Sequence, residues 1–333
     1  MYTSLAQAIK AYQQHLESQN LKANTIKNRT QPLRLALEVL GSGDISRITG
    51  NDMDSVFAHY DWSPRTRNLY LSSYRSFFKW CRHSRLVPRD FDPTINYSNR
   101  RIPRTQKQRV PVENFPALLD ACSHPRDRAT VALGLYTFLR GSELQTLQIQ
   151  DVDFSESMLR IYRHKTEDED HLPICTELRD ELTRWLNWYR QDQRTLVPNW
   201  YLLPSKRPNH FTWVDGERVQ VSTTPPLRPD KMMTHPYRPA KRALASLGLD
   251  AVGEGEHTLR RSGARALFDA LRAEGHQGAL MRVSSMLGHR DTRITEHYIG
   301  LDAERVQRNE LLAGKPMFKT QGKTGLRVVG DDG

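Results

Sequence analysis

The sequence predicts a mainly α-helical protein of the α+β class, in which a small antiparallel β-sheet belongs to the second of two domains. Apolar residues recur at helical spacing through the first part of the chain, and no strand pattern interrupts them. The segments 158–163 and 171–174 alternate in polarity and flank the run KTEDED, which is typical of a β-hairpin. A length of 333 residues also suits two domains better than one.

Helices account for the whole N-terminal part in this prediction. The first follows Thr3 or Ser4, either of which is a suitable N-cap. The second contains Pro32, so a kink or a late helix start is expected there. The fourth begins near Ser63 and carries aromatic residues at helical spacing, which favours a buried face over a base-stacking surface. These residues are Tyr70, Tyr74, Phe77 and Phe78.

In the second domain the pattern predicts helices, the hairpin and one segment without a clear period. The run 205–235 is rich in proline, lysine and arginine, and we interpret it as an insertion or a mobile loop. A further strand-like stretch surrounds Leu147 and Ile149. The helices are expected at about residues 112–122, 126–137, 140–147, 176–193, 238–247, 257–272 and 279–287.

Basic residues outnumber acidic ones by 49 to 38, which gives a net charge of +11. This excess favours a polyanion such as nucleic acid as a partner, because lysine and arginine displace counterions from phosphates. A basic protein without such a partner is the alternative. Residues 98–110 hold five basic residues and no acid, and we interpret them as an interdomain linker. The candidate phosphate-binding side chains are Arg100, Arg101, Arg104, Lys107, Arg109, Arg65, Arg67 and Arg75.

Several other classes of protein are disfavoured. No apolar run is long enough for a membrane helix, and the N-terminus lacks the pattern of a signal peptide. The cysteines, Cys81, Cys122 and Cys175, form no CxxC pair, which argues against a disulfide framework and a structural zinc site. We therefore expect a cytoplasmic protein without a metal, a cofactor or a membrane partner.

Two pairs of polar residues share a helix face in the second domain. Arg140 stands at a predicted helix start, and Glu143 follows one turn later, where its carboxylate can orient the guanidinium. His257 and Arg260 have the same spacing and project to one side of one helix. Each pair alone is more often a surface salt bridge or a structural histidine than a functional site.

A third pair lies near the end of the chain. His289 and Tyr298 are nine residues apart, so a continuous helix would place them on opposite faces. Gly288 as a helix C-cap and Asp291 as an N-cap predict a break between them. Lys165 stands at the mouth of the predicted hairpin. Taken singly, these residues too are more often structural than functional.

In this order and spacing the residue set resembles that of the tyrosine recombinases, which include phage integrases and chromosome-dimer resolvases. The resemblance covers about residues 4–315. It implies a helical, SAM-like core-type DNA-binding domain at 1–97 and a basic linker at 98–110. A tyrosine recombinase catalytic domain follows at 111–315, and a flexible tail at 316–333. The activity implied is site-specific cleavage and rejoining of DNA, for integration and excision of a phage or mobile element.

The resemblance also implies how the scissile phosphate is bound. Arg140 and Arg260 grip it, offset its negative charge and stabilise the pentacovalent transition state without a metal. Glu143 supports the first arginine. His289 donates a hydrogen bond to a phosphate oxygen.

Tyr298 is the nucleophile that the resemblance implies. Its phenol needs a proton acceptor, because tyrosine has a reference pKa of about 10, and His257 is expected to accept the proton. Lys165 is expected to protonate the departing 5′-oxygen. The product is a 3′-phosphotyrosyl link, which the 5′-hydroxyl of a second DNA partner can attack.

The partners implied are double-stranded DNA core sites and, on that DNA, three further copies of this chain in a homotetramer. The free chain is expected to be a monomer. Host or phage accessory proteins that bend DNA are further candidates. The protein would act at the nucleoid or, if phage-encoded, in the host cytoplasm. The segment after Tyr298 contains a short amphipathic helix that packs either on its own domain or on a neighbouring subunit.

Two features depart from the family's pattern, and two other functions stay open. The hairpin loop carries four acids, Glu167 to Asp170, which either face solvent or pair with a basic neighbour. Arg261 occupies a position where many relatives have histidine. A type IB topoisomerase uses the same residue types to relax supercoils. A non-catalytic DNA-binding protein on the same scaffold is the alternative from another class.

Overall fold

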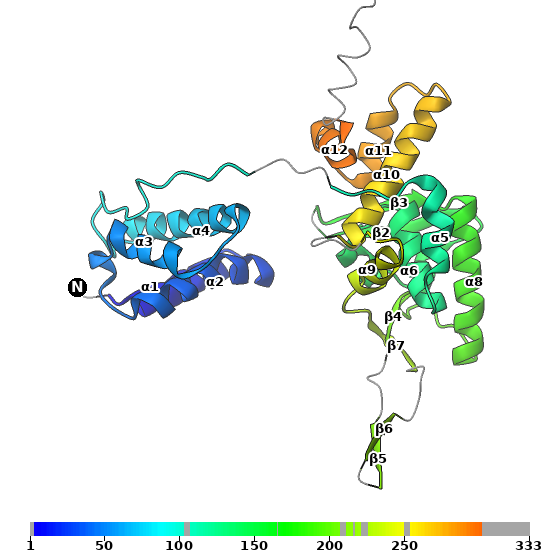
Figure 1. The fold of residues 1–333 in the computed structure, drawn as a ribbon, viewed down its shortest axis with the longest axis horizontal. Coiled ribbons are helices and arrows are strands. Elements are labelled where there is room, and N and C mark those ends of the chain that lie inside the picture. The colour runs from blue at the N-terminus through cyan, green and yellow to red at the C-terminus, as the bar shows by residue number, and fades with distance from the viewer. Residues whose placement is uncertain are drawn as a thin grey trace, which may run out of the picture. The chain divides into compact units, whose positions relative to one another are not determined.

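A computed structural model divides the chain into two compact units, with the boundary between Thr105 and Gln106 (Figure 1). Each unit encloses its own hydrophobic core. Many helices and a few short antiparallel sheets make up these units, which confirms the predicted fold class. The residues described are 3–102, 107–164, 166–206, 211–215, 217–220, 226–249 and 254–301.

The first unit is helical throughout its described secondary structure. Ser4 is the N-cap of the first helix, since its hydroxyl accepts a hydrogen bond from the Gln7 amide at 3.2 Å. Three of the four aromatic residues predicted to be buried, Tyr74, Phe77 and Phe78, are at most 2% exposed. The elements are α1 (Leu5–Ser18), α2 (Ala23–Leu40), the 3₁₀ turn η1 (Ile45–Arg47), α3 (Gly50–His59) and α4 (Pro64–His83).

The prediction of a late helix start at Pro32 is wrong. Helix α2 begins at Ala23 and continues past the proline. Pro32 is buried, and its carbonyl accepts a hydrogen bond from the Tyr74 hydroxyl at 2.9 Å. Burial of the ring and this hydrogen bond offset the backbone hydrogen bond that a proline removes from a helix.

A three-stranded antiparallel sheet lies in the second unit. Its strand order is β1 (Val152–Asp153), β2 (Met158–Arg163) and β3 (Asp168–Pro173). The last two strands form the predicted hairpin, and Arg163 pairs with Asp168 next to the turn. The turn of the hairpin therefore lies between Arg163 and Asp168, the part of the sequence in which Lys165 is predicted to stand.

The prediction of a strand around Leu147 and Ile149 is wrong. A 3₁₀ turn, η3 (Ile149–Asp151), occupies this place. The Gln148 amide closes it by donating a hydrogen bond to the Asp151 carboxylate at 2.8 Å. Local bonding between a side chain and the backbone overrides the apolar alternation here.

The loop predicted at 205–235 is also wrong in part, because two antiparallel ribbons form in this region. One pairs β4 (Pro204–Lys206) with β7 (Leu227–Met232), and the other pairs β5 (Phe211–Val214) with β6 (Glu217–Gln220). A two-stranded ribbon is joined by backbone hydrogen bonds and does not require one buried face. Its sequence therefore lacks the alternation that marks a half-buried strand.

Helix α6 is the centre of the second unit, and helices α8, α9 and α10 pack against it. Every helix predicted for this unit is present, and its ends lie within two residues of the predicted ones. No described helix is both long and apolar enough to cross a bilayer. The helices are the 3₁₀ turn η2 (Val112–Asn114), α5 (Phe115–Asp120), α6 (Pro125–Tyr136), α7 (Gly141–Thr146), α8 (Thr176–Gln193), α9 (Tyr237–Ser246), α10 (Glu256–Ala273), α11 (Ala279–Leu287) and α12 (Thr292–Ile299).

Close packing of α10 on α6 depends on Gly263. A Cβ added there would lie 1.7 Å from the Leu135 carbonyl oxygen and 2.7 Å from the Phe138 ring. Helix α10 also carries His257 and Arg260 in its first turns. The contact therefore sets how close these two side chains come to the rest of the site.

We expect Gly263→Ala to lower the free energy of unfolding by more than about 2 kcal/mol, because a methyl group here overpacks the helix pair. Urea denaturation of the full chain, followed by circular dichroism, measures the change. Gly43→Ala is the control, since no atom lies within 4 Å of a Cβ at that position. Equal stability of the two variants would contradict the prediction.

Candidate active site

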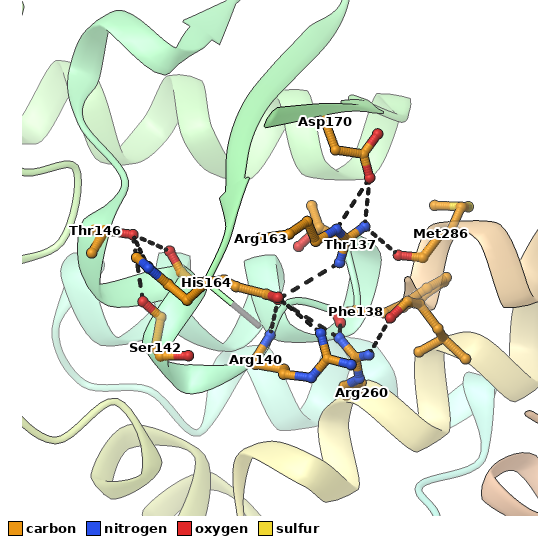
Figure 2. Close-up of polar contacts among 12 residues, drawn as sticks. Thr137, Phe138, Arg140, Ser142, Thr146, Arg163, His164, Asp170, Arg260 and Met286 are labelled. Atoms are coloured by element: carbon orange, nitrogen blue, oxygen red, sulfur yellow. Dashed lines mark hydrogen bonds and ion pairs between the residues drawn. The ribbon is translucent and has the colours of Figure 1, made fainter. Parts of the chain in front are cut away.

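One buried carboxylate organises the site. Glu143, in the first turn of α7, has a side chain that is only 1% exposed. Its Oε1 lies 2.9 Å from Arg140 Nη1. Its Oε2 lies 3.7 Å from Arg163 Nη1 and 3.9 Å from Arg260 Nη1. Figure 2 shows these three arginines converging from the start of α7, from β2 and from α10.

Arg260 and Arg140 differ in exposure. Arg260 is 2% exposed and donates hydrogen bonds to the carbonyls of Phe138 and, at 2.6 Å, Leu287. Arg140 is the N-cap residue of α7, and its side chain is 24% exposed. Its backbone amide also donates to the Glu143 carboxylate, at 2.7 Å. In this cluster the Arg260 guanidinium is thus buried, and the Arg140 guanidinium lies near the surface.

Tyr298 lies beside these arginines in the same chain. Its hydroxyl donates a hydrogen bond to the carbonyl of His257 at 3.2 Å and lies 3.5 Å from Nδ1 of that imidazole. The centroid of its ring is 5.9 Å from the guanidinium carbon of Arg260. His257 and Arg260 both belong to α10, so one helix presents two groups to the phenol.

The break predicted between His289 and Tyr298 is confirmed. Gly288 ends α11 in the left-handed region, with φ of 63°. Asp291 caps α12, because its carboxylate accepts a hydrogen bond from the Arg293 amide at 2.9 Å. The His289 and Tyr298 rings consequently meet edge to face, with centroids 5.7 Å apart.

A chain of hydrogen bonds orients the His289 imidazole. The Ser284 hydroxyl donates to the His289 carbonyl at 3.2 Å, and the Thr295 hydroxyl donates to Ser284 Oγ at 3.0 Å. Thr295 therefore presents an acceptor to Nδ1 of His289, which lies 3.0 Å away. This network fixes the orientation of the His289 ring.

Burial and positive neighbours shift the ionisation of three site residues. Burial lowers the pKa of Arg260 to about 10. Burial, followed by the charges of Arg260, Arg261 and Arg140, lowers the pKa of His257, which favours the neutral imidazole near pH 7. Burial raises the pKa of Tyr298 against the opposing effect of the same arginines. The phenol therefore keeps its proton beside an imidazole able to accept it.

The buried cluster carries more positive than negative charge. Three guanidinium groups face Glu143 and one further carboxylate, that of Asp170. An anion with two equivalent oxygens, such as a phosphodiester, suits this excess because guanidinium groups bind it in bidentate geometry. Among the described residues, no group of three or more His, Cys, Asp or Glu is arranged to hold a metal ion.

The predicted DNA-binding residues differ in what they contact. Arg67 donates to the Ser98 carbonyl at 3.3 Å, and Arg75 donates to the Tyr97 carbonyl. These bonds hold the segment that follows α4 against that helix. Four others are exposed, namely Arg65, Arg100, Arg101 and Lys107.

Arg109 contacts the helix that carries Tyr298. It donates a hydrogen bond to the carbonyl of Ile299, at the C-terminal end of α12. Lys165, Arg104 and the segment after Leu301 lie outside the described residues, so their predicted roles stay predictions.

Sequence reasoning missed Arg163. It follows Leu159 and Ile161 at the inward positions of β2, and a charged residue at such a position requires an acidic partner. That pattern was a usable signal. Asp170 is one such partner, at 2.8 Å, while the three acids before it are exposed. In the acidic hairpin loop, exposure to solvent therefore applies to Glu167, Asp168 and Glu169, and pairing with a basic neighbour applies to Asp170.

Two further contacts shape the site. The Glu256 carboxylate lies so close to Gly141 that an added Cβ would be 2.3 Å from it, which explains why glycine follows Arg140. Burial raises the pKa of Glu256. Arg261 is buried and pairs with Glu254 at 2.5 Å, so its guanidinium is engaged within the chain.

Comparison with known proteins identifies the family. The sequence profile of the phage integrase family matches residues 108–305, more than half of the chain. The chain belongs to the phage integrase family. It is a tyrosine recombinase, an enzyme that cuts and rejoins DNA strands. The tyrosine recombinase XerC of Alcanivorax borkumensis is 28% identical over 314 residues, which cover 90% of this chain and 91% of that protein.

Solved structures of lambda integrase share the fold. A lambda integrase dimer bound to a COC′ core site has a TM-score of 0.64 and 13% identity, over 90% of this chain and 77% of that one. A lambda integrase tetramer bound to a Holliday junction has a TM-score of 0.62 and 13% identity, over 89% and 77%. At this identity the likeness concerns the fold alone.

We expect Glu143→Gln to destabilise the second unit by roughly 3–5 kcal/mol, because it leaves buried guanidinium groups without their shared carboxylate. It should also slow DNA cleavage at least about a hundredfold at a temperature where the variant stays folded. Thermal unfolding and single-turnover cleavage measure the two effects.

Glu181→Gln is the matched control for Glu143→Gln. Glu181 is another buried carboxylate that pairs with two arginines, Arg128 and Arg184, but it lies on α8. Its loss should lower stability and leave the cleavage rate within about threefold of wild type. Equal cleavage losses in the two variants would show that only stability matters.

Proposed function

We propose that this recombinase is site-specific and becomes covalently joined to DNA through Tyr298. The phenol oxygen attacks the scissile phosphorus, forms a 3′-phosphotyrosyl bond and displaces the 5′-oxygen of the next nucleotide. The 5′-hydroxyl of a second DNA strand then attacks that bond, reseals the backbone and releases the tyrosine. One phosphoester bond is exchanged for another at each step, so no ATP is consumed.

Protons move between groups of the chain in this scheme. His257 accepts the phenol proton, and the neutral state favoured by its lowered pKa supports this role. Lys165 protonates the departing 5′-oxygen. This second role rests on the sequence, since Lys165 lies outside the described residues.

Arg140 and Arg260 hold the two non-bridging oxygens of the phosphate. Glu143 fixes the direction of both guanidinium groups, and positive charge aimed at the pentacovalent phosphorus stabilises the transition state. His289 donates to a phosphate oxygen from Nε2. The Thr295 hydroxyl, 3.0 Å from Nδ1, orients the His289 ring for this contact.

The position of Tyr298 is the observation that carries the proposal. Its hydroxyl lies 3.5 Å from the His257 imidazole, and its ring lies beside Arg260. A tyrosine that served packing alone would not require a cluster of incompletely neutralised arginines, whose burial costs desolvation energy. A nucleophile that must reach a phosphate requires such a cluster.

We further propose that the substrate is a pair of double-stranded core sites, on which four copies of the chain assemble. The net charge of +11 and the exposed basic residues support DNA binding. Residues 1–97 would serve as the core-type DNA-binding domain, 98–110 as the linker and 316–333 as a flexible tail. Accessory DNA-bending proteins, and integration and excision of a phage or mobile element, belong to the same proposal.

Tyr298→Phe should abolish the covalent adduct with DNA, because the variant lacks the attacking oxygen. The substrate is a nicked duplex built on an inverted repeat from the DNA that flanks the gene, and denaturing electrophoresis detects the adduct. Tyr237→Phe, at an exposed tyrosine, is the control and should form adduct as wild type does.

Three other outcomes of this experiment would redirect the proposal. Tight binding by wild type without any adduct would favour a DNA-binding protein. Relaxation of a supercoiled plasmid without recombinant product would favour a topoisomerase. An adduct that survives Tyr298→Phe would assign the nucleophile to another residue.

The cleavage rate should stay high down to pH 6.5 and fall only below it, because His257 has a lowered pKa and stays neutral above that pH. His257→Ala should slow cleavage about a hundredfold at neutral pH. Its rate should then rise with pH, since the raised pKa of Tyr298 makes ionised phenol scarce until alkaline pH. Single-turnover rates between pH 5 and 10 measure both profiles, and an unchanged acid limb in His257→Ala would remove His257 from the role of base.

A further inference from the structure

Arg163 is a buried arginine at the end of a hairpin strand, and arginine is seldom buried unless it is paired. Strand β2 alternates between exposed and buried positions, and Arg163 takes a buried one, with a side chain 5% exposed. A buried charge is costly unless other groups hold it. The partners of Arg163 therefore indicate what it does.

These partners come from three separate elements (Figure 2). On β3, Asp170 Oδ2 accepts from Nε at 3.1 Å and from Nη2 at 2.8 Å. At the end of α11, the Met286 carbonyl accepts from Nη2 at 2.8 Å. On α7, Glu143 Oε2 lies 3.7 Å from Nη1. One guanidinium thus joins the hairpin, α11 and the carboxylate that supports Arg140.

The contact with α11 has a counterpart from the other side of the site. Arg163 donates a hydrogen bond to the Met286 carbonyl, and Arg260 donates one to the next carbonyl, that of Leu287. Carbonyls in the last turn of a helix lack intrahelical partners and carry its negative dipole end. The two arginines therefore fix the end of α11, two residues before His289.

The backbone after α11 also fits around Arg163. A Cβ at Gly288 would lie 3.3 Å from the guanidinium carbon of Arg163, and Gly288 has a positive φ of 63°. Glycine meets both demands, the left-handed backbone and the close approach. The turn between α11 and α12, which contains His289, thus packs directly against the Arg163 side chain.

We infer that Arg163 is a positioning residue of the recombinase, which locks the hairpin and the α11–α12 turn onto Glu143. It acts through its neighbours and does not itself contact DNA. This inference rests on the proposed function. It predicts that loss of Arg163 misplaces Arg140 and His289 by small distances, which slows cleavage and leaves the affinity for DNA intact.

The test compares Arg163→Met with a matched control on the same strand. Arg160 pairs with Asp151 at 2.8 Å, but its side chain is 47% exposed, so Arg160→Met removes an equal charge from the outer face of β2. Cleavage of the nicked duplex is measured at saturating DNA, and affinity is measured separately by gel shift. Thermal unfolding sets a temperature at which each variant is folded.

Arg163→Met should cleave between about ten and a hundred times more slowly than wild type at saturating DNA. Its affinity should stay within about threefold, and Arg160→Met should match wild type in rate. Arg163→Lys should recover only part of the rate, because an ammonium cannot reach three partners with the geometry of a guanidinium. A purely structural role would give wild-type rates in every variant that folds.

Asp170→Asn provides a second test that keeps the arginine in place. It should slow cleavage, and it should add little to Arg163→Met in the double variant, because both changes break one interaction. If Arg163→Met does not fold, Asp170→Asn alone tests the inference, and a wild-type cleavage rate in Asp170→Asn overturns it.

Two outcomes separate this inference from the proposed function. A wild-type protein that forms no adduct overturns the proposed function itself. A wild-type adduct together with an unimpaired Arg163→Met overturns only the inference. A loss of affinity in Arg163→Met that equals its loss of rate would make Arg163 an ordinary phosphate contact.

Discussion

The convergence of three guanidinium groups on the Glu143 carboxylate is the constraint on which the catalytic unit depends. Arg140, Arg163 and Arg260 come from a helix start, a strand end and a long helix, so the carboxylate ties these elements to one point. The attraction between opposite charges is strong where water is excluded, but like charges repel there too. The excess of positive charge therefore favours the addition of an anion to the cluster.

Carbonyl groups, as well as carboxylates, hold the guanidinium groups of Arg260 and Arg163 in place. Arg260 donates to the carbonyls of Phe138 and Leu287, and Arg163 donates to that of Met286. A carbonyl satisfies an N–H group and fixes its direction without cancelling its formal charge. The positive field thus stays available to a ligand. Burial, and after it the charges of Arg260, Arg261 and Arg140, lowers the pKa of His257, so the arginine cluster adds to the effect of burial in keeping this imidazole neutral.

Much of the fold could be predicted because caps and alternation leave local patterns, whereas the site residues, weak signals singly, could be predicted only because their order and spacing resemble those of a known family. The break at Gly288 and Asp291 followed from cap preferences, and the hairpin followed from alternation. The β4–β7 ribbon did not, because each of its strands buries only its first residue, so neither shows alternation. Contacts such as that of Arg163 with Met286 could not be predicted either, since a carbonyl acceptor leaves no trace in the residue type.

The way α12 is anchored explains how Tyr298 is aimed at the site. The helix has only eight residues, of which Thr295 and Ile299 are buried. Its inner side is held by the hydrogen bonds of Thr295, and its C-terminal carbonyl at Ile299 accepts from Arg109. Hydrogen bonds of this kind contribute only about 0.5–1.5 kcal/mol each. Tyr298 is therefore aimed by direction-specific hydrogen bonds together with the burial of Ile299 in a cluster shared with α10 and α11.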